Sequence, residues 1–127
     1  MKFSCSVCDK IYDSSKVPIW LCDCGKPLVV HYNWENKVKS IDVIEHELSL
    51  WRYKSVLPDI ETVISLGEGH TPLIPISNNV YVKDETVNPT GSFKDRGMAL
   101  AITMAKAQGV ETICLPSAGN AGISAAA

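Results

Sequence analysis

The sequence predicts an α/β protein in which a small cysteine-rich module precedes the start of a parallel α/β sheet. Four of the five cysteines lie within the first 24 residues, as a Cys-x-x-Cys pair and a Cys-x-Cys pair. Further along, a strand-like segment at 80–85, a helical segment at 92–108 and a strand-like segment at 111–115 follow one another. This order is typical of a β-α-β unit, whose strands are parallel and whose crossover is right-handed.

Composition and charge exclude several classes of protein. With 46% hydrophobic and 20% charged residues, the chain of 127 residues can bury a core of ordinary size. The net charge of −2 and the absence of a Lys/Arg run give no electrostatic attraction to nucleic acid or anionic membranes. No apolar run approaches the ~20 residues that span a bilayer, and the N-terminus lacks a signal-peptide core. We therefore expect a soluble cytoplasmic protein with no nucleic-acid and no membrane partner.

The first predicted domain, residues 1–32, is a zinc-ribbon-like module built on Cys5, Cys8, Cys22 and Cys24. Two closely spaced cysteine pairs suit one tetrahedral metal ion. Thiolate ligands select zinc or iron, and zinc is the commoner structural choice. A disulfide pair, inert thiols and a site that has lost its metal are the alternatives, although a reducing cytosol argues against disulfides.

Other features of this module are weaker. Short strands are expected near residues 20–21 and over 28–32. Trp20 and Tyr12 are available to cover a module that has little core of its own. His31 is an alternative, auxiliary metal ligand.

Residues 33–59 are predicted to form a connector and a helical arm. Residues 33–40 are polar and are expected to connect the two larger parts. A short helix is expected over 43–50, continuing towards residue 53, before Pro58 ends it.

The third predicted domain, residues 60–127, begins the parallel sheet. Its helix at 92–108 ends at Gly109, a natural C-terminal stop, and another helix begins near residue 119. The predicted apolar face of the longer helix is made by residues at a helical period: Phe93, Leu100, Met104 and Ala107.

The second predicted strand places Cys114 in an apolar run, where we expect a buried structural thiol. A doubly wound sheet needs more elements than this to cover both faces. We therefore expect the chain to be the N-terminal part of a longer protein and to associate as a homo-oligomer, since uncovered strand edges seek partners.

Lys94 is the residue whose surroundings point most directly to chemistry. It follows a Pro-Thr-Gly-Ser turn in residues 88–97 and begins a helix, whose first turn disfavours a further positive charge. Apolar Phe93 and Met98 beside it would raise the cost of desolvating an ammonium. Both effects favour a neutral amine, which forms a Schiff base with an aldehyde. The alternative is a solvated lysine with Asp95 nearby.

Four blocks, in order, resemble those of threonine synthases and related fold-type II pyridoxal-phosphate enzymes. Residues 88–97 resemble the segment that carries the cofactor lysine. Three further blocks match at residues 67–74 (Gly-Glu-Gly-His-Thr-Pro-Leu-Ile), 80–85 (Val-Tyr-Val-Lys-Asp-Glu) and 116–122 (Pro-Ser-Ala-Gly-Asn-Ala-Gly). The resemblance implies a fold-type II catalytic domain that binds pyridoxal 5'-phosphate.

The resemblance also assigns roles to individual residues. Lys94 would bind the cofactor aldehyde as a Schiff base and move protons on the substrate carbons. The Asn120 amide would contact the phenolic oxygen of the cofactor. Backbone N–H groups of the helix-opening loop would bind the substrate carboxylate, with Ser117, Gly119 and Ala121 contributing. Without Lys94 before it, this loop would be an ordinary glycine-rich helix start.

Some parts of the family pattern are absent or changed. The glycine-rich loop for the cofactor phosphate and the polar residue facing the pyridine nitrogen lie downstream in the family, so this chain alone should bind the cofactor poorly. Ala118 and Ala121 occupy positions where hydroxyl residues are frequent, which leaves the substrate less certain than the cofactor. His70 either lies near the substrate or caps backbone.

The main hypothesis is therefore the N-terminal part of a threonine synthase, which converts O-phosphohomoserine and water to threonine and phosphate. Its substrate is a small amino acid. Cysteate synthase, serine/threonine dehydratase and diaminopropionate ammonia-lyase share the lysine and asparagine motifs and are the enzymatic alternatives. The non-enzymatic alternative is a zinc-ribbon protein that retains a vestigial half of the cofactor domain.

Overall fold

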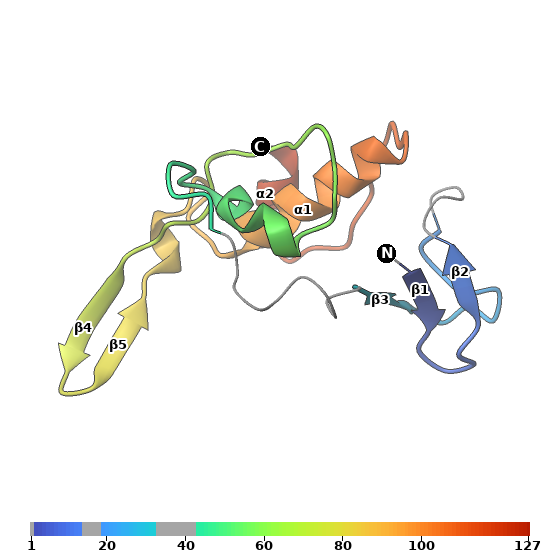
Figure 1. Cartoon of the computed structure of the whole chain (residues 1–127), viewed down its shortest axis with the longest axis horizontal. Coiled ribbons are helices and arrows are strands. Elements are labelled where there is room, and N and C mark those ends of the chain that lie inside the picture. The colour runs from blue at the N-terminus through green and yellow to red at the C-terminus, as the bar shows by residue number, and fades with distance from the viewer. Residues whose placement is uncertain (1, 14–18, 33–42) are drawn as a thin grey trace. The chain divides into compact units, whose positions relative to one another are not determined.

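The chain folds as two units, Met1–Asp42 and Val43–Ala127, each with its own antiparallel sheet (Figure 1). The computed structural model describes residues 2–13, 19–32 and 43–127. The predicted connector at 33–40 lies outside the described residues.

The first unit contains a three-stranded antiparallel sheet in the order β2-β1-β3. Its strands are β1 (Lys2–Cys5), β2 (Ile11–Asp13) and β3 (Leu28–His31). The strand predicted over 28–32 is therefore confirmed, and it pairs with β1 so that Cys5 lies opposite Leu28.

The strand expected near residues 20–21 was wrong. At residues 20–21 only an isolated bridge forms, between Leu21 and Pro27. Of the two aromatic residues available to cover the module, Trp20 is 72% exposed, whereas the Tyr12 hydroxyl donates to the Cys22 sulfur at 3.1 Å. His31 bonds Ser4, with Nε2 lying 2.7 Å from the hydroxyl oxygen.

The first helix of the second unit is the 3-10 helix η1 (Leu50–Val56), so the predicted helix forms over residues 50–53 but not over 43–49. Ser49 explains the difference because its Oγ accepts the backbone N–H of Trp51 at 3.2 Å and caps the helix. The side chain of Glu47 accepts the backbone N–H of Ser49 at 2.7 Å. This hydrogen bond stabilises a turn before Ser49 in place of a helix.

A hairpin follows, made of β4 (Leu73–Ser77) and β5 (Val80–Lys83), with Asn79 at φ +61° in its turn. The predicted strand at 80–85 is confirmed over its first four residues, but its partner is the antiparallel β4. The short 3-10 helix η2 (Glu85–Val87) begins at Asp84, whose side chain accepts the N–H of Thr86.

The two helices of the second unit, α1 (Lys94–Ala107) and α2 (Asn120–Ala126), pack against each other, and the hairpin extends away from them (Figure 1). The helices predicted from 92 and from 119 are thus confirmed. The strand predicted over 111–115 was wrong: this segment has no regular structure, and both sheets of the described residues are antiparallel. A parallel strand exists only beside a hydrogen-bonded neighbour, and the described chain offers this segment none.

The buried face of α1 also differs from the predicted one. Its buried residues are Asp95, Ala99 and Thr103, which recur every fourth position. Thr103 is fully buried because its Oγ1 accepts the N–H of Ile64 at 2.8 Å and donates to the Ile64 carbonyl at 3.3 Å. The buried face of α1 therefore carries small and polar residues, because the backbone at Ile64 lies close to it. Phe93, which was predicted to lie on the buried face, is 56% exposed.

Two further observations complete the fold. Cys114, predicted to be buried, is exposed. No described helix is both long and apolar enough to cross a membrane.

Candidate active site

Lys94 is the first residue of α1. Its backbone N–H donates to Ser92 Oγ at 3.2 Å, which fixes the turn that starts the helix. The Lys94 ammonium lies 4.7 Å from the centroid of the Phe93 ring. The sequence predicted that Phe93 would help to bury the lysine amine. Phe93 is instead largely exposed, and it makes a cation–π contact with the Lys94 ammonium.

Asp95 is not the partner of Lys94. Its Oδ2 accepts the backbone N–H of Thr90 at 2.7 Å, and its Oδ1 accepts the Thr90 hydroxyl. Burial of the carboxyl works to raise its pKa, but the Ser124 hydroxyl and the hydrogen bonds from Thr90 outweigh burial and leave the pKa below its usual range. Asp95 is therefore a buried anion that holds the turn in front of Lys94.

Arg96 anchors the same helical turn to η2, which follows β5. Its Nε and Nη2 donate to the two carboxylate oxygens of Glu85 at 2.7 and 2.8 Å. This guanidinium, with further hydrogen bonds from Thr71 and Asn88 acting against burial, lowers the pKa of Glu85 to about 2. The same pair raises the pKa of Arg96, so both groups are charged across the whole range in which enzymes work.

The loop at residues 65–70 is built around a buried glutamate. Glu68 is fully buried, and its Oε2 accepts the Ser65 hydroxyl at 2.9 Å and the Leu66 N–H at 2.8 Å. Gly69 follows at φ +115°, and its N–H donates to Asn88 at 3.0 Å. For His70, the sequence left open whether it lies near the substrate or caps backbone; its Nδ1 lies 2.8 Å from Nη1 of Arg52.

The loop predicted to bind the substrate carboxylate opens α2. Ser117 Oγ accepts the backbone N–H groups of Gly119 and Gly122 at 3.1 and 2.9 Å. Gly119 lies at φ +150°, a backbone conformation that other residues rarely adopt. Asn120 is the first residue of α2 and is exposed, and Ala121 is half-buried. Lys94 and Asn120 thus each begin one of two helices that pack together.

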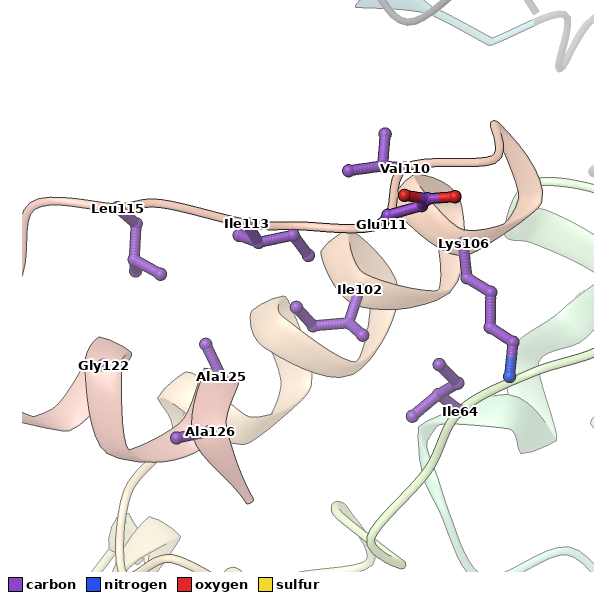
Figure 2. Close-up of a pocket in the computed structure, with 10 residues that line it drawn as sticks. All are labelled: Ile64, Ile102, Lys106, Val110, Glu111, Ile113, Leu115, Gly122, Ala125 and Ala126. Atoms are coloured by element: carbon purple, nitrogen blue, oxygen red, sulfur yellow. The ribbon is translucent and has the colours of Figure 1, made fainter.

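A cavity of this unit is separate from these residues. It has a volume of about 520 Å³ and lies between α1, α2 and the extended segment that follows α1. Figure 2 shows Ile113 and Leu115 of this segment facing Ile102 of α1 and Ala125 of α2. Lys94, Ser117, Gly119, Asn120 and Ala121 do not line it.

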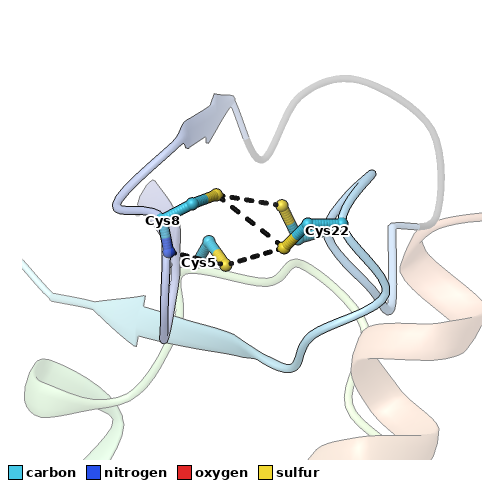
Figure 3. Close-up of side chains that lie close together, drawn as sticks. Cys5, Cys8 and Cys22 are labelled. Carbon is cyan, nitrogen blue, oxygen red and sulfur yellow. Dashed lines mark hydrogen bonds between the residues drawn. The ribbon is translucent and has the colours of Figure 1, made fainter.

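In the first unit, the structure brings the four predicted cysteines together. All four sulfur atoms lie within 4.8 Å of one another (Figure 3). The Cys5–Cys24, Cys8–Cys22 and Cys8–Cys24 sulfur distances are 3.5, 3.6 and 3.8 Å. A tetrahedral zinc with Zn–S bonds of about 2.3 Å requires S–S edges of about 3.8 Å, so the donor set fits the ion in number, chemistry and spacing.

The surroundings of these sulfurs favour thiolates unequally. The backbone N–H of Cys24 and then the Tyr12 hydroxyl, 3.1 Å from the sulfur, lower the pKa of Cys22 to about 6. Cys24 itself donates to the sulfurs of Cys22 and Cys5, which raises its pKa to about 12. Four adjacent thiols cannot all ionise alone, whereas a divalent cation would allow all four to do so.

Comparison with known proteins identifies the family of the second unit. Residues 64–127 match the family model described as "Pyridoxal-phosphate dependent enzyme". The chain belongs to this family. No solved structure matches the chain.

Several curated relatives carry the name threonine synthase. The protein of Methanocaldococcus jannaschii is 40% identical over 136 residues, which cover 97% of this chain and 33% of that protein. The protein of Methanosarcina acetivorans is 33% identical over 91% of this chain and 31% of its own length. The protein of Halalkalibacterium halodurans is 48% identical over 63% of this chain and 27% of its own length. The chain thus spans about a third of the length of these relatives.

Sequence reasoning missed the residues that hold Lys94 in place. From the sequence, Asp95 is expected only as a neighbour of the lysine. In the structure its carboxylate accepts both the hydroxyl and the backbone N–H of Thr90, five positions earlier. Glu85 and Arg96 carry opposite charges on the two sides of the turn, which was the available signal for their ion pair.

Proposed function

We propose that this chain is the N-terminal part of a pyridoxal-phosphate-dependent threonine synthase, which converts O-phosphohomoserine and water to threonine and phosphate. The observation that carries the proposal is the match to the threonine synthase of Methanocaldococcus jannaschii, which extends over 97% of the chain and includes the cysteine module. Membership of the pyridoxal-phosphate family supports the same reaction type.

Lys94 is the residue that would hold the cofactor, through its amine and the aldehyde carbon. When bound, the cofactor supplies an electron sink for charge that develops on the substrate carbons. Lys94 then serves as the group that takes and returns protons at those carbons. Its place fits these roles, because the amine extends from a turn that Ser92, Asp95 and Arg96 all fix.

Asn120 and its loop would supply the polar contacts. A neutral amide at Asn120 can donate to the phenolic oxygen of the cofactor without adding charge. Ser117 Oγ already accepts two backbone N–H groups, and its own hydrogen could be donated to a substrate carboxylate. The backbone N–H groups of Gly119 and Ala121 belong to the same loop and would add to this carboxylate site.

The cysteine module would hold one structural zinc ion through Cys5, Cys8, Cys22 and Cys24. Its three short strands bury little apolar surface, and an ion with four thiolate ligands would supply the missing stability. Lys10 and Asp23 form an ion pair between the two cysteine-bearing turns, which favours the same closed arrangement.

The decisive experiment uses the full-length protein, meaning this chain continued to the length of its relatives. Borohydride reduction in the presence of pyridoxal 5'-phosphate is expected to leave a pyridoxyl group on the peptide that contains Lys94. Lys83, whose ammonium bonds the Thr71 carbonyl, and Lys106, near the C-terminal end of α1, are internal controls that should stay unlabelled. Lys94→Ala should abolish both the label and the release of phosphate from O-phosphohomoserine. A label on another lysine would overturn the assignment.

A further inference from the structure

Asp95 has an environment that its neighbours in sequence do not explain. Its side chain is 1% exposed, yet the ion pairs of the described residues do not include it. A buried carboxylate without a cation is costly unless hydrogen bonds replace its water. Thr90 supplies two such bonds, one from its backbone and one from its hydroxyl.

The other side of Asp95 faces α2. Asp95 and Ser124 line the same small cavity of about 80 Å³, together with Ala99 and Ile102 of α1. Ser124 is 6% exposed, and its hydroxyl makes no hydrogen bond of ordinary geometry within the described residues. The shared cavity places this hydroxyl beside the carboxylate, and Ser124 is one of the groups that lower the pKa of Asp95. The buried hydroxyl of Ser124 is thus poised to donate to Asp95.

Ser124 also has a fixed relationship to Asn120. The two residues are four positions apart in α2, so their side chains leave the helix on the same face. Asp95 has an equally close relationship to Lys94, since the two share the first turn of α1. A contact between Asp95 and Ser124 therefore joins the turn that carries Lys94 to the helix face that carries Asn120.

We propose that Asp95 is a positioning residue, which sets the place of Lys94 relative to Asn120 by holding Thr90 on one side and Ser124 on the other. The inference rests on the proposed function, because it gives Lys94 and Asn120 their cofactor roles. Asp95 itself touches neither cofactor nor substrate. Its carboxylate acts through the two elements that it joins. An amide would keep one acceptor for the Thr90 N–H, but it would lose the negative charge and the second acceptor, to which the Thr90 hydroxyl donates.

The test compares Asp95→Asn and Ser124→Ala with the matched control Asp84→Asn in the full-length protein. Asp84 also accepts both the N–H and the hydroxyl of a threonine, Thr86, but it caps η2, and its hydrogen bonds among the described residues go to Thr86 and Pro72. Two readouts are used: the affinity for pyridoxal 5'-phosphate and the wavelength of the absorption band that the bound cofactor gives. Exchange of backbone amides over residues 117–123 is measured without cofactor.

Asp95→Asn is expected to weaken the affinity about tenfold or more and to move the band, because hydrogen bonds to a charged group are lost and the ring oxygen loses its alignment with Asn120. Amide exchange over 117–123 should rise in the same variant. Ser124→Ala should act in the same direction, and its effect should disappear in the Asp95→Asn background. Asp84→Asn should match the wild type in all three measurements.

The outcomes separate the two proposals. If the wild type binds the cofactor through Lys94 while Asp95→Asn and Ser124→Ala match Asp84→Asn, the positioning role is wrong and the proposed function stands. If the wild type places no cofactor on Lys94, the proposed function itself fails. Should Asp95→Asn not fold, Ser124→Ala decides by the same readouts.

Discussion

Arg96 holds Glu85 through both carboxylate oxygens, with Nε 2.7 Å from Oε2 and Nη2 2.8 Å from Oε1. Nη2 also donates to Thr71 Oγ1 at 3.1 Å, and that hydroxyl donates to Glu85 at 2.6 Å. Asn88 adds a bond to Glu85 at 2.8 Å. Three separate parts of the second unit, the segment before β4, the turn after β5 and the helix α1, thus meet at one half-buried carboxylate.

The first prediction concerns this carboxylate. Glu85→Gln is expected to destabilise the second unit by at most about 3 kcal/mol at neutral pH, the value of a pKa change from 4.5 to about 2. Because the folded-state pKa is the lower one, the stabilisation is present above the unfolded value of 4.5 and is lost as the pH falls towards 2. Urea unfolding measured from about pH 7 to about pH 3 checks this.

The control is Glu61→Gln, which removes an exposed carboxylate from the same unit. The Glu85→Gln variant should lose less stability on acidification than the wild type, so the two curves should converge at low pH. Parallel curves for Glu85→Gln and wild type would show that the ion pair does not contribute.

The second prediction concerns the contact between α1 and residue 64. Thr103→Val keeps the shape of the side chain but leaves the Ile64 N–H without its acceptor and the Ile64 carbonyl without its donor. Leaving a buried polar group unpaired costs about 1–3 kcal/mol. Thr103→Ser keeps the hydroxyl and should lose far less stability. Equal unfolding free energies for the two variants, measured in urea, would contradict the role given to this hydroxyl.

The helices and the cysteine cluster could be predicted because their signals are local. The backbone hydrogen bonds of a helix such as α1 form between residues four positions apart. The sequence spacing of the four cysteines, Cys5, Cys8, Cys22 and Cys24, is typical of a tetrahedral metal site. Whether residues 111–115 form a strand could not be predicted from local sequence, because the hydrogen bonds of a strand come from a segment distant in sequence. The same reason explains why Cys114 was wrongly expected to be buried.

The polar network around Lys94 was missed for a different reason. A helical period identifies which residues can share a face, but it does not say which face meets another backbone. On α1 the buried stripe is Asp95, Ala99 and Thr103, and two of its three residues are polar. Only the positions of Thr90 and Ile64 in space explain that choice.

The third prediction uses a glycine at a close approach. Gly69 lies at φ +115°, and a Cβ there would stand 2.9 Å from the backbone nitrogen of Leu50. Gly69→Ala should therefore cost more than about 1 kcal/mol, since both the conformation and the contact are unfavourable. Gly97→Ala is the matched control, because a Cβ there meets nothing within 4 Å, and it should stabilise α1 by up to about 1 kcal/mol. Chemical unfolding that ranks the two variants in the opposite order would refute this account.

The last prediction concerns the metal. After expression with ample zinc, the chain is expected to contain about one zinc ion per molecule, because the four sulfurs already lie at the spacing of a tetrahedral site. Cys24→Ser should lower the zinc content sharply, since its sulfur lies within 4 Å of both Cys5 and Cys8. Elemental analysis of the purified protein gives the ratio directly.

The control for the metal is Cys114→Ser, which removes the cysteine outside the cluster and should leave the zinc content unchanged. Removing the ion with a chelator should unfold the first unit, because its sheet of three short strands has few other stabilising contacts. The second unit contains none of the four ligands, so its unfolding transition should persist. A chain that holds no zinc and titrates four free thiols in its first unit would rule out the structural ion, and the sulfur cluster would then have to be stable as thiols alone.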